Sequence, residues 1–535
     1  MDDMRGNLSR RQLLAGGLAF GGSLAALEAL EHGRLVIPAA TAAAMQPKRG
    51  GTLVAAQEVD PVGLDPHTSS NFSALQGYEH IYESLTGYDE KTNIVPALAE
   101  KWEISNGGKT YVFHLRPNVK FHNGQTMTAD DVKYSIDRVI DPKTASPWSS
   151  WFDLVQEVRI VDPLTIQIGL KDPYPGLLGA FAGMRASGII PKGFAERENL
   201  KIKAIGTGPF KLVEFVPQDH ITYARNADYW DKPLPYLDGM TFKILTEDNA
   251  RLAALRAGQV QYAAITAQGE AQLKSVQGIT VLKGPSAWVA LHYINVYKKP
   301  LNDWRVRKAM RMAVDTNEVI QKAVFGAGVP SGPVPTGYGD WYLDPKTLPY
   351  QKPDIDGAKK LLAEAGYPNG GFKIEIKCSP QYPEFVATTL IVQDSLKKLG
   401  IDVQVVQMEW GAFVKDNTTT IKSGGKEGGE IFASANTFRP DPDGYIYPYF
   451  HSAGTLNEGG YKNTKLDPLM QQARSIFNHD QRKSLYREVQ RTLLDESPNW
   501  WWYAKLNIEA MTGKVQGYAQ SFTGRRIFLK KAWLA

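Results

Sequence analysis

The sequence of 535 residues contains a single cysteine, Cys378. An intrachain disulfide and a cysteine zinc site are therefore both excluded. The chain also has little excess charge. It contains 61 lysine and arginine residues and 56 aspartate and glutamate residues, so its net charge is only +5. So small a surplus, spread over the whole chain, gives no reason to expect a nucleic-acid partner.

Motifs of the common enzyme families are absent as well. The chain has no His-Glu-x-x-His, no Gly-x-Ser-x-Gly and no Gly-x-Gly-x-x-Gly after a predicted strand. The nine histidines are scattered, and no spacing among them indicates a metal cluster. We therefore expect a protein that is not an enzyme and that needs neither a metal nor another cofactor.

The residues that are present indicate a folded protein with an export signal. A content of 43% hydrophobic and 10% aromatic residues is too rich for a disordered chain, and the length allows several domains. Near the N-terminus, Arg10 and Arg11 precede an apolar stretch that ends in small residues. This arrangement is typical of a twin-arginine signal, which we place at 1–44.

A retained membrane anchor is the weaker alternative for the same segment. Glu28 and Glu31 interrupt the apolar stretch, whereas a spanning helix needs about 20 consecutive apolar residues. We expect cleavage after Ala42 or Ala44. The mature protein is then free in a periplasm-like space, without an anchor.

Strand-like and helix-like segments alternate along the mature chain. Thr128 and Asp131 have the spacing of a helix capping box. A helix that is followed by Gly400 and then by a strand suits a parallel sheet packed between helices. We predict strands at 52–56, 109–115, 164–170, 208–216, 289–295, 372–378 and 402–407, and helices at 74–85, 128–139, 248–257, 304–325, 355–365 and 383–399. The fold class is therefore mixed α/β with several domains.

Several longer motifs follow one another in a fixed order. They include Pro-Ala-Leu-Ala-Glu-Lys-Trp-Glu at 96–103, the stretch 109–124, Thr-Ala-Asp-Asp-Val at 128–132, Gly-Thr-Gly-Pro-Phe at 206–210 and Asp-Trp-Arg-Val-Arg-Lys-Ala at 303–309. Together they resemble the family-5 extracellular solute-binding proteins of ABC importers, a group that includes oligopeptide-, dipeptide- and nickel-binding proteins. The resemblance covers essentially the whole mature chain.

The resemblance implies a periplasmic-binding-protein-like α/β fold with two lobes, an inserted domain and an inter-lobe cleft that closes on a hinge. By this analogy lobe I comprises 45–92, 206–286 and 504–535, the inserted domain II comprises 93–205, and lobe III comprises 287–503. The implied function is capture of a peptide or peptide-like solute in the periplasm and delivery to the transmembrane subunits of a permease. We expect a monomer.

The resemblance also places ligand-contacting side chains in one loop. That loop supplies Phe438, Arg439, Asp441, Asp443 and Tyr445. Arg439 can clamp an anionic group through two parallel hydrogen bonds. The alternative for the two aspartates is a purely structural turn, since Asp-Pro-Asp-Gly is a typical turn sequence.

Two tryptophans and one further loop complete the predicted site. Trp288 and Trp410 either stack on a ring of the solute or belong to the core. Asn71 and His67 lie in the loop after the first predicted strand, and we include them as candidates.

One departure from the family pattern concerns the solute. Peptide-binding members carry an acidic residue, which binds the peptide amino terminus, at the position that corresponds here to Phe438. Without that carboxylate a buried ammonium group lacks its partner, although Asp441 or Asp443 can substitute. An opine, an oligosaccharide or a chelated metal therefore remains an alternative solute, and a chemosensory or chaperone-like role remains an alternative function.

Overall fold

The computed structural model describes residues 46–69, 72–350, 352–457 and 459–535. Every element named below belongs to one compact unit, Arg49–Ala535. The predicted export signal lies outside the described residues and stays a prediction. Within the described part of the chain, no helix combines the length and the apolar character that crossing a membrane requires.

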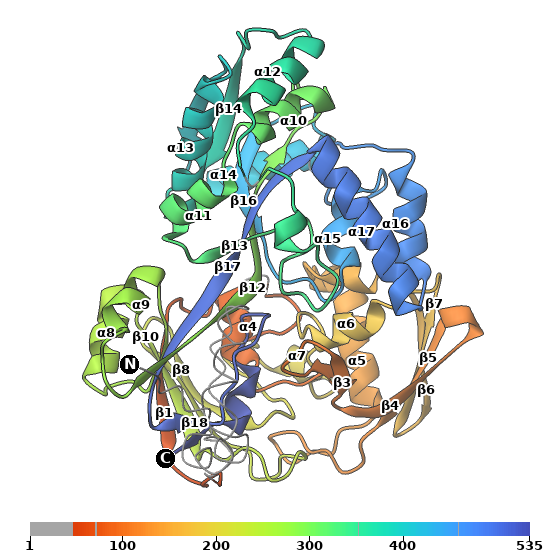
Figure 1. Cartoon of the computed structure of the whole chain (residues 1–535). Coiled ribbons are helices and arrows are strands. Elements are labelled where there is room, and N and C mark those ends of the chain that lie inside the picture. The colour runs from red at the N-terminus through yellow and green to blue at the C-terminus, as the bar shows by residue number, and fades with distance from the viewer. Residues whose placement is uncertain (1–45, 70–71, 351, 458) are drawn as a thin grey trace, which may run out of the picture. The chain divides into compact units, whose positions relative to one another are not determined.

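The largest sheet has eleven strands in the order β15-β14-β16-β12-β17-β11-β1-β10-β9-β8, and β13 pairs with β17. The strands β12 and β17 are long and run antiparallel, side by side (Figure 1). They connect the group around β1 to the group around β14. The strands are β1 (Thr52–Gln57), β8 (Phe210–Val216), β9 (His220–Arg225), β10 (Gly239–Ile244), β11 (Tyr262–Ala264), β12 (Ile279–Ile294), β13 (Gly328–Pro330), β14 (Lys373–Cys378), β15 (Asp402–Gln407), β16 (Ile431–Asn436) and β17 (Asn499–Thr512).

The strands β14, β15 and β16 form the predicted parallel part of this sheet. Strand β14 pairs in parallel with both β15 and β16. Apolar side chains of the surrounding helices, such as Met310 and Leu396, are fully buried in the same core cluster as Ile374 and Ile376 of β14. The helices are α10 (Trp304–Met312), α11 (Thr316–Val324), α12 (Ile355–Glu364), α13 (Pro383–Lys397) and α14 (Trp410–Lys422).

Two predicted helices have wrong bounds. The single helix expected at 304–325 is two helices, because the Asp315 side chain accepts hydrogen bonds from the backbone N–H groups of Asn317 and Glu318 and so begins a new helix, α11. The helix expected at 74–85 is α4 (Phe72–Tyr78). It ends early because the carbonyls of His80 and Ile81 accept hydrogen bonds from the 208–210 segment instead of from their own helix.

A separate antiparallel sheet has the order β4-β5-β7-β6 and lies within the range predicted for the inserted domain. Successive residues of β5 alternate between half-buried and buried, with Tyr111, Phe113 and Leu115 buried, as expected for 109–115. The predicted capping box of Thr128 and Asp131 is confirmed at the start of α5. The elements are β4 (Ala99–Ser105), β5 (Thr110–Leu115), β6 (Val155–Asp162), β7 (Thr165–Leu170), α5 (Ala129–Ile140), α6 (Leu177–Ala182) and α7 (Phe194–Arg197).

The last helices of the chain pack on an aromatic core. Tyr445, Tyr486 and Trp501 are buried there. The helices are α15 (Asp443–Phe450), α16 (Leu466–Ser475) and α17 (His479–Glu496). The remaining elements are β2 (Thr86–Tyr88), β3 (Ile94–Pro96), β18 (Val515–Gln516), β19 (Trp533–Leu534), α8 (Asp248–Arg256), α9 (Ala267–Leu273) and the short 3-10 helices η1 (Asn106–Gly108), η2 (Pro142–Thr144), η3 (Ser149–Phe152), η4 (Pro345–Thr347) and η5 (Ile527–Lys531).

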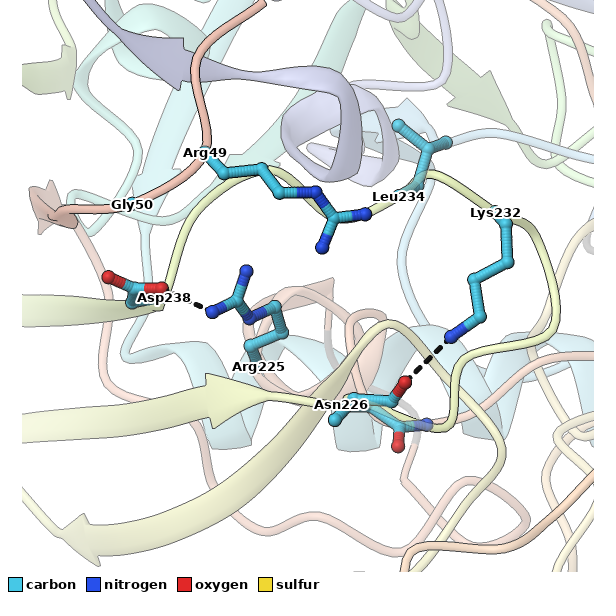
Figure 2. A pocket seen from close by; sticks show the side chains of 8 residues that line it. Arg49, Gly50, Arg225, Asn226, Lys232, Leu234 and Asp238 are labelled. Carbon is cyan, nitrogen blue, oxygen red and sulfur yellow. Dashed lines mark hydrogen bonds and ion pairs between the residues drawn. The ribbon is translucent and has the colours of Figure 1, made fainter.

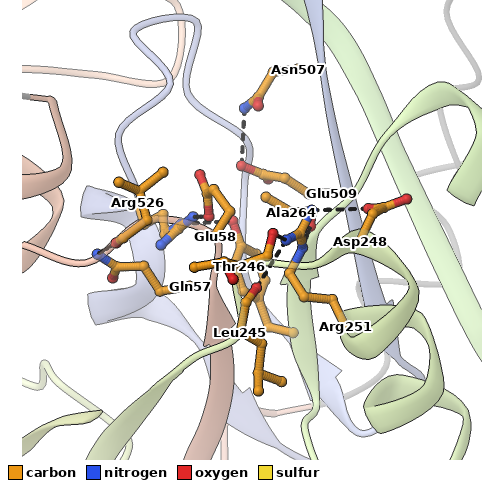
Figure 3. Close-up of polar contacts among 12 residues, drawn as sticks. Gln57, Glu58, Leu245, Thr246, Asp248, Arg251, Ala264, Asn507, Glu509 and Arg526 are labelled. Atoms are coloured by element: carbon orange, nitrogen blue, oxygen red, sulfur yellow. Dashed lines mark hydrogen bonds and ion pairs between the residues drawn. The ribbon is translucent and has the colours of Figure 1, made fainter. Parts of the chain in front are cut away.

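Buried charged groups fix β1, β11 and β17 to one another (Figure 3). Arg526 donates to Glu58 at 2.6 Å, directly after β1. Arg251 of α8 donates to three backbone carbonyls of the neighbouring segments. Glu509 of β17 accepts from Asn507 at 3.0 Å, and burial raises the pKa of Glu509. These groups are hydrogen-bonded within the chain, so this network holds the segments around β1, β11 and β17 in place.

Candidate functional site

Three strands of the large sheet end at the same edge. Strands β14, β15 and β16 are parallel, and ligands of α/β proteins bind outside the carboxyl ends of such strands. Trp410 follows β15, and the loop 437–443, which leads into α15, follows β16. Trp288 lies beside that loop, because its neighbour Val289 pairs with Asn436, the last residue of β16. The structure thus brings Trp288, Trp410 and the predicted loop to one edge.

Aromatic rings connect the two predicted tryptophans. Trp288 stacks on Phe385 with ring centroids 5.7 Å apart, and Phe385 contacts Tyr382 at 5.1 Å. Tyr382 in turn contacts Trp410 edge-on at 4.9 Å. Trp288, Tyr382 and Trp410 are only half-buried. We call these four residues, Trp288, Phe385, Tyr382 and Trp410, the aromatic row. Trp410 also stacks on Phe413, and Lys505 lies over the ring of Trp288, so a solute can contact only the parts of the half-buried rings that remain accessible.

Arg439 is held at the same edge by neutral groups. Its guanidinium donates to the hydroxyls of Tyr449 at 2.6 Å and Thr437 at 3.2 Å. Its backbone N–H donates to the hydroxyl of Tyr445 at 2.9 Å. Tyr445 is fully buried and so supports the loop from below. Among the described residues, no carboxylate forms an ion pair with Arg439.

Asp441 is committed to an arginine of another helix. Arg482 of α17 donates to both carboxylate oxygens of Asp441, at 2.5 and 2.8 Å. Asp441 also accepts from the backbone N–H of Asp443 at 2.8 Å, as in a typical Asx turn. The pair is buried, so Asp441 locks the loop onto α17.

Asp443 is paired in a similar way. Its carboxylate lies 3.2 Å from Nε of Arg474 and accepts from the Tyr486 hydroxyl, also at 3.2 Å. Burial raises the pKa of Asp443 to about 6 despite the charge of Arg474. The geometry therefore favours the turn interpretation for both aspartates.

Phe438 is almost fully buried, with 3% of its surface exposed. Its ring meets the rings of Tyr88 and Tyr338 edge-on at 5.7 and 6.1 Å. Since both nearby aspartates are paired with arginines, neither is a free substitute for the acidic anchor of peptide-binding members.

Helix α6 and strand β2 pack against the same loop. The Tyr88 hydroxyl donates to the backbone carbonyl of Pro440 at 2.8 Å. A Cβ atom on Gly179 of α6 would lie only 2.4 Å from that carbonyl oxygen, so the close approach requires glycine. The loop 437–443 is therefore the place where the β16 edge meets α6 and β2, and we call it the junction loop.

His67 has no free ring nitrogen for a solute. It is fully buried, and its Nε2 and Nδ1 lie 2.8 Å from the Gly188 carbonyl and from Arg138, respectively. Arg138 also donates to both oxygens of Asp65. Burial lowers the pKa of His67 to about 4, so the ring is neutral at pH 7. Asn71 lies outside the described residues.

The sequence analysis missed Arg185, which follows α6. This side chain is only 3% exposed and lies over the ring of Trp148 at 4.6 Å. Its Nε atom has no hydrogen-bond partner. The available signal was its isolation, because Arg185 is the only charged residue in the apolar stretch 177–190.

One pocket lies elsewhere, between β9, β10 and the segment that precedes β1 (Figure 2). Its volume is about 530 Å³, and Arg49, Arg225 and Lys232 line it. These cations are already engaged: Arg225 with Asp238, and Arg49 and Lys232 with backbone carbonyls. The pocket has no aromatic wall, so we do not assign the solute to it. In the described part of the chain, no cluster of three or more histidine, cysteine or acidic residues is arranged to hold a metal.

Comparison with known proteins decides the family. The family of bacterial extracellular solute-binding proteins, family 5, matches residues 93–457. The chain belongs to this family. The resemblance found in the sequence motifs is thereby confirmed, and the α/β fold class with it.

Individual members of family 5 are similar over nearly the whole chain. The dipeptide-binding protein of Escherichia coli is 29% identical over 93% of this chain and 97% of its own length. Heme-binding protein A of Haemophilus influenzae is 31% identical over 88% of this chain and 90% of its own. Among solved structures, the periplasmic binding protein DppA of Helicobacter pylori in complex with the peptide STSA has a TM-score of 0.77, at 26% identity over 91% of this chain and 98% of that chain.

Proposed function

We propose that this family-5 protein is the periplasmic solute-binding component of an ABC importer. It captures a peptide or peptide-like solute at the edge formed by the aromatic row and the junction loop. It then delivers the solute to the transmembrane subunits of a permease.

The observation that carries the proposal is the full-length similarity to peptide-binding members of family 5. The dipeptide-binding protein of Escherichia coli and the peptide complex of DppA both cover more than nine-tenths of this chain. The site supports the same conclusion, since it combines aromatic walls with a few oriented polar groups, as small-molecule sites do.

Capture involves closure around the solute. The junction loop contacts β2 through the hydrogen bond from Tyr88 to Pro440, and it contacts α6 where Pro440 lies against Gly179. Arg474 lies 3.7 Å from Asp153 across the same boundary. A solute that touches both sides of this boundary binds the closed state more tightly than the open one. It therefore shifts the population towards closure, and the closed state is the one that a permease recognises.

A second candidate is the same role for a non-peptide solute. Phe438 favours it, because this buried ring occupies the position of the acidic residue that binds a peptide amino terminus in other members. A solute without a free ammonium group does not need that anchor.

Uptake in a strain that lacks the gene tests the role. We expect the deletion strain to lose import of radiolabelled di- and tripeptides and to recover it with the wild-type gene, while chemotaxis towards the same peptides is unchanged. Undiminished uptake in the deletion strain contradicts the importer role. Lost chemotaxis with normal uptake indicates the sensory alternative instead.

A further inference from the structure

Seven arginines of the described chain are buried, and six of them have hydrogen-bond partners. Arg185 is the exception, as it forms no hydrogen bond and no ion pair. The other six donate to carboxylates, hydroxyls or backbone carbonyls: Arg251, Arg307, Arg311, Arg482, Arg525 and Arg526. A buried guanidinium without partners is costly, so the missing partner calls for an explanation.

The surroundings of Arg185 are aromatic and contain a further unpartnered group. The guanidinium lies over the rings of Trp148 and Phe72, at 4.6 and 5.7 Å. The hydroxyl of Tyr78, which is also buried, has no hydrogen-bond partner. Rings stabilise the cation from its faces, but they leave its buried Nε–H group without a hydrogen-bond acceptor.

Arg439 of the junction loop carries a second positive charge. It precedes Pro440, which packs against Gly183, two residues before Arg185: a Cβ atom on Gly183 would lie 3.3 Å from Cβ of Pro440. Burial and, next, the charge of Arg439 lower the pKa of Arg185 to about 10. Arg185 is therefore still charged at pH 7. Arg439 donates only to neutral oxygens, those of Thr437, Phe438 and Tyr449.

The acidic groups around the two arginines are used by other cations. Asp441 and Asp443 are paired with Arg482 and Arg474. Glu79 is paired with Arg525, and Asp65 with Arg138. No carboxylate of the described chain is thus left to neutralise Arg185 and Arg439.

We propose that Arg185 and Arg439 together bind an oxyanion of the captured solute, a carboxylate or a phosphate. The planar forks of two guanidiniums offer paired N–H donors to such a group. The inference rests on the proposed function and adds to it the chemistry of the solute.

The position of the two arginines also links this anion to closure. Arg185 follows α6, whereas Arg439 follows β16, and the two sides meet at the junction loop. With the solute absent, two like charges repel each other across the boundary. An oxyanion between them converts this repulsion into attraction and so favours the closed state.

Calorimetric titration of the exported protein with three probes tests the inference. The probes are a panel of di- and tripeptides with free C-terminal carboxylates, the same panel as C-terminal amides, and sodium phosphate. We expect the free acids to bind at least about tenfold more tightly than the amides, as loss of a charged hydrogen bond implies. Arg185→Met and Arg439→Met should each remove this difference. Arg185→Lys should restore part of it, and the exposed control Arg491→Met should bind like wild type.

Each other outcome contradicts one specific claim. Equal affinity for acids and amides, or unchanged binding by Arg185→Met, overturns the oxyanion site while peptide binding, and with it the proposed function, still holds. If neither peptide panel binds, the proposal of a peptide solute is wrong. The titration with sodium phosphate then tests the oxyanion site. Phosphate binding that is lost in Arg185→Met upholds the oxyanion site, and absence of phosphate binding overturns it.

Discussion

Two sets of charged side chains meet at the junction loop, and they differ in whether the chain neutralises them. Asp441 with Arg482, and Asp443 with Arg474, are closed pairs in which each charge has a partner. Arg185 and Arg439 have no acidic partner in the described chain. The two aspartate–arginine pairs hold the junction loop in its conformation. The two arginines without an acidic partner indicate instead that the solute carries a negative charge.

Breaking the Asp441–Arg482 pair should have the largest effect on stability. Asp441→Ala leaves Arg482 as an uncompensated buried charge, so we expect the free energy of unfolding to fall by about 3 to 5 kcal/mol. Urea denaturation of the two proteins measures this. A loss below about 1 kcal/mol, the usual value of an exposed pair, contradicts the assigned structural role.

The second pair, Asp443 with Arg474, should make the stability of the protein depend on pH. Because the pKa of Asp443 is raised to about 6 from 3.8, the folded state binds a proton between these values that the unfolded state has lost. The contribution of Asp443 to stability therefore falls as the pH rises through this window.

Asp443→Asn removes this titration. From pH 4 to pH 7, the stability of the variant relative to wild type should rise by about 2 to 3 kcal/mol. Denaturation midpoints at several pH values provide the measurement, and parallel pH profiles for the two proteins show that the Asp443 carboxylate is not perturbed.

Removing an unpartnered charge should have the opposite effect from removing a paired one. For Arg185→Met we expect the free energy of unfolding to be unchanged or up to about 1 kcal/mol higher. The variant loses the contact with Trp148, but it no longer buries an unpaired charge. Solute-free protein in the same urea assay is the material to use. A destabilisation as large as that of Asp441→Ala would show that Arg185 has a structural partner after all.

The aromatic row should contribute the smallest effect. Trp410→Ala removes one ring face, so binding of an aromatic or peptide solute should weaken about fivefold, the equivalent of roughly 1 kcal/mol. Trp304→Ala, which alters an exposed ring at the start of α10, is the matched control. Equal affinities of the two variants in calorimetry remove Trp410 from the site.

Local patterns predicted most of the fold. The strand at 402–407 and the capping box of Thr128 and Asp131 occur as expected, since adjacent residues decide both. The helix at 304–325 was wrong because Asp315 begins a new helix inside an apolar pattern that continues across it.

The candidate site could be predicted only in part, because it is formed by contacts between residues that are far apart in the sequence. The turn motif at 441–444 was recognised, but the partner of Asp441 is Arg482, which lies 41 residues away on another helix. Arg185 was missed because it stands out only as a buried side chain without a hydrogen-bond partner, which a sequence does not show. The missing partner becomes visible only in the folded chain, where Arg185 is 3% exposed and its Nε atom has no acceptor.

Native mass spectrometry of the protein, released gently from the periplasm of the cells that export it, tests the central claim most directly. We predict a mass excess from a retained solute, and that the compound released on denaturation carries a carboxylate or phosphate. Protein with Arg185→Met should appear at the mass of the polypeptide alone. A retained solute without any acidic group, present equally in wild type and in the variant, would contradict the account.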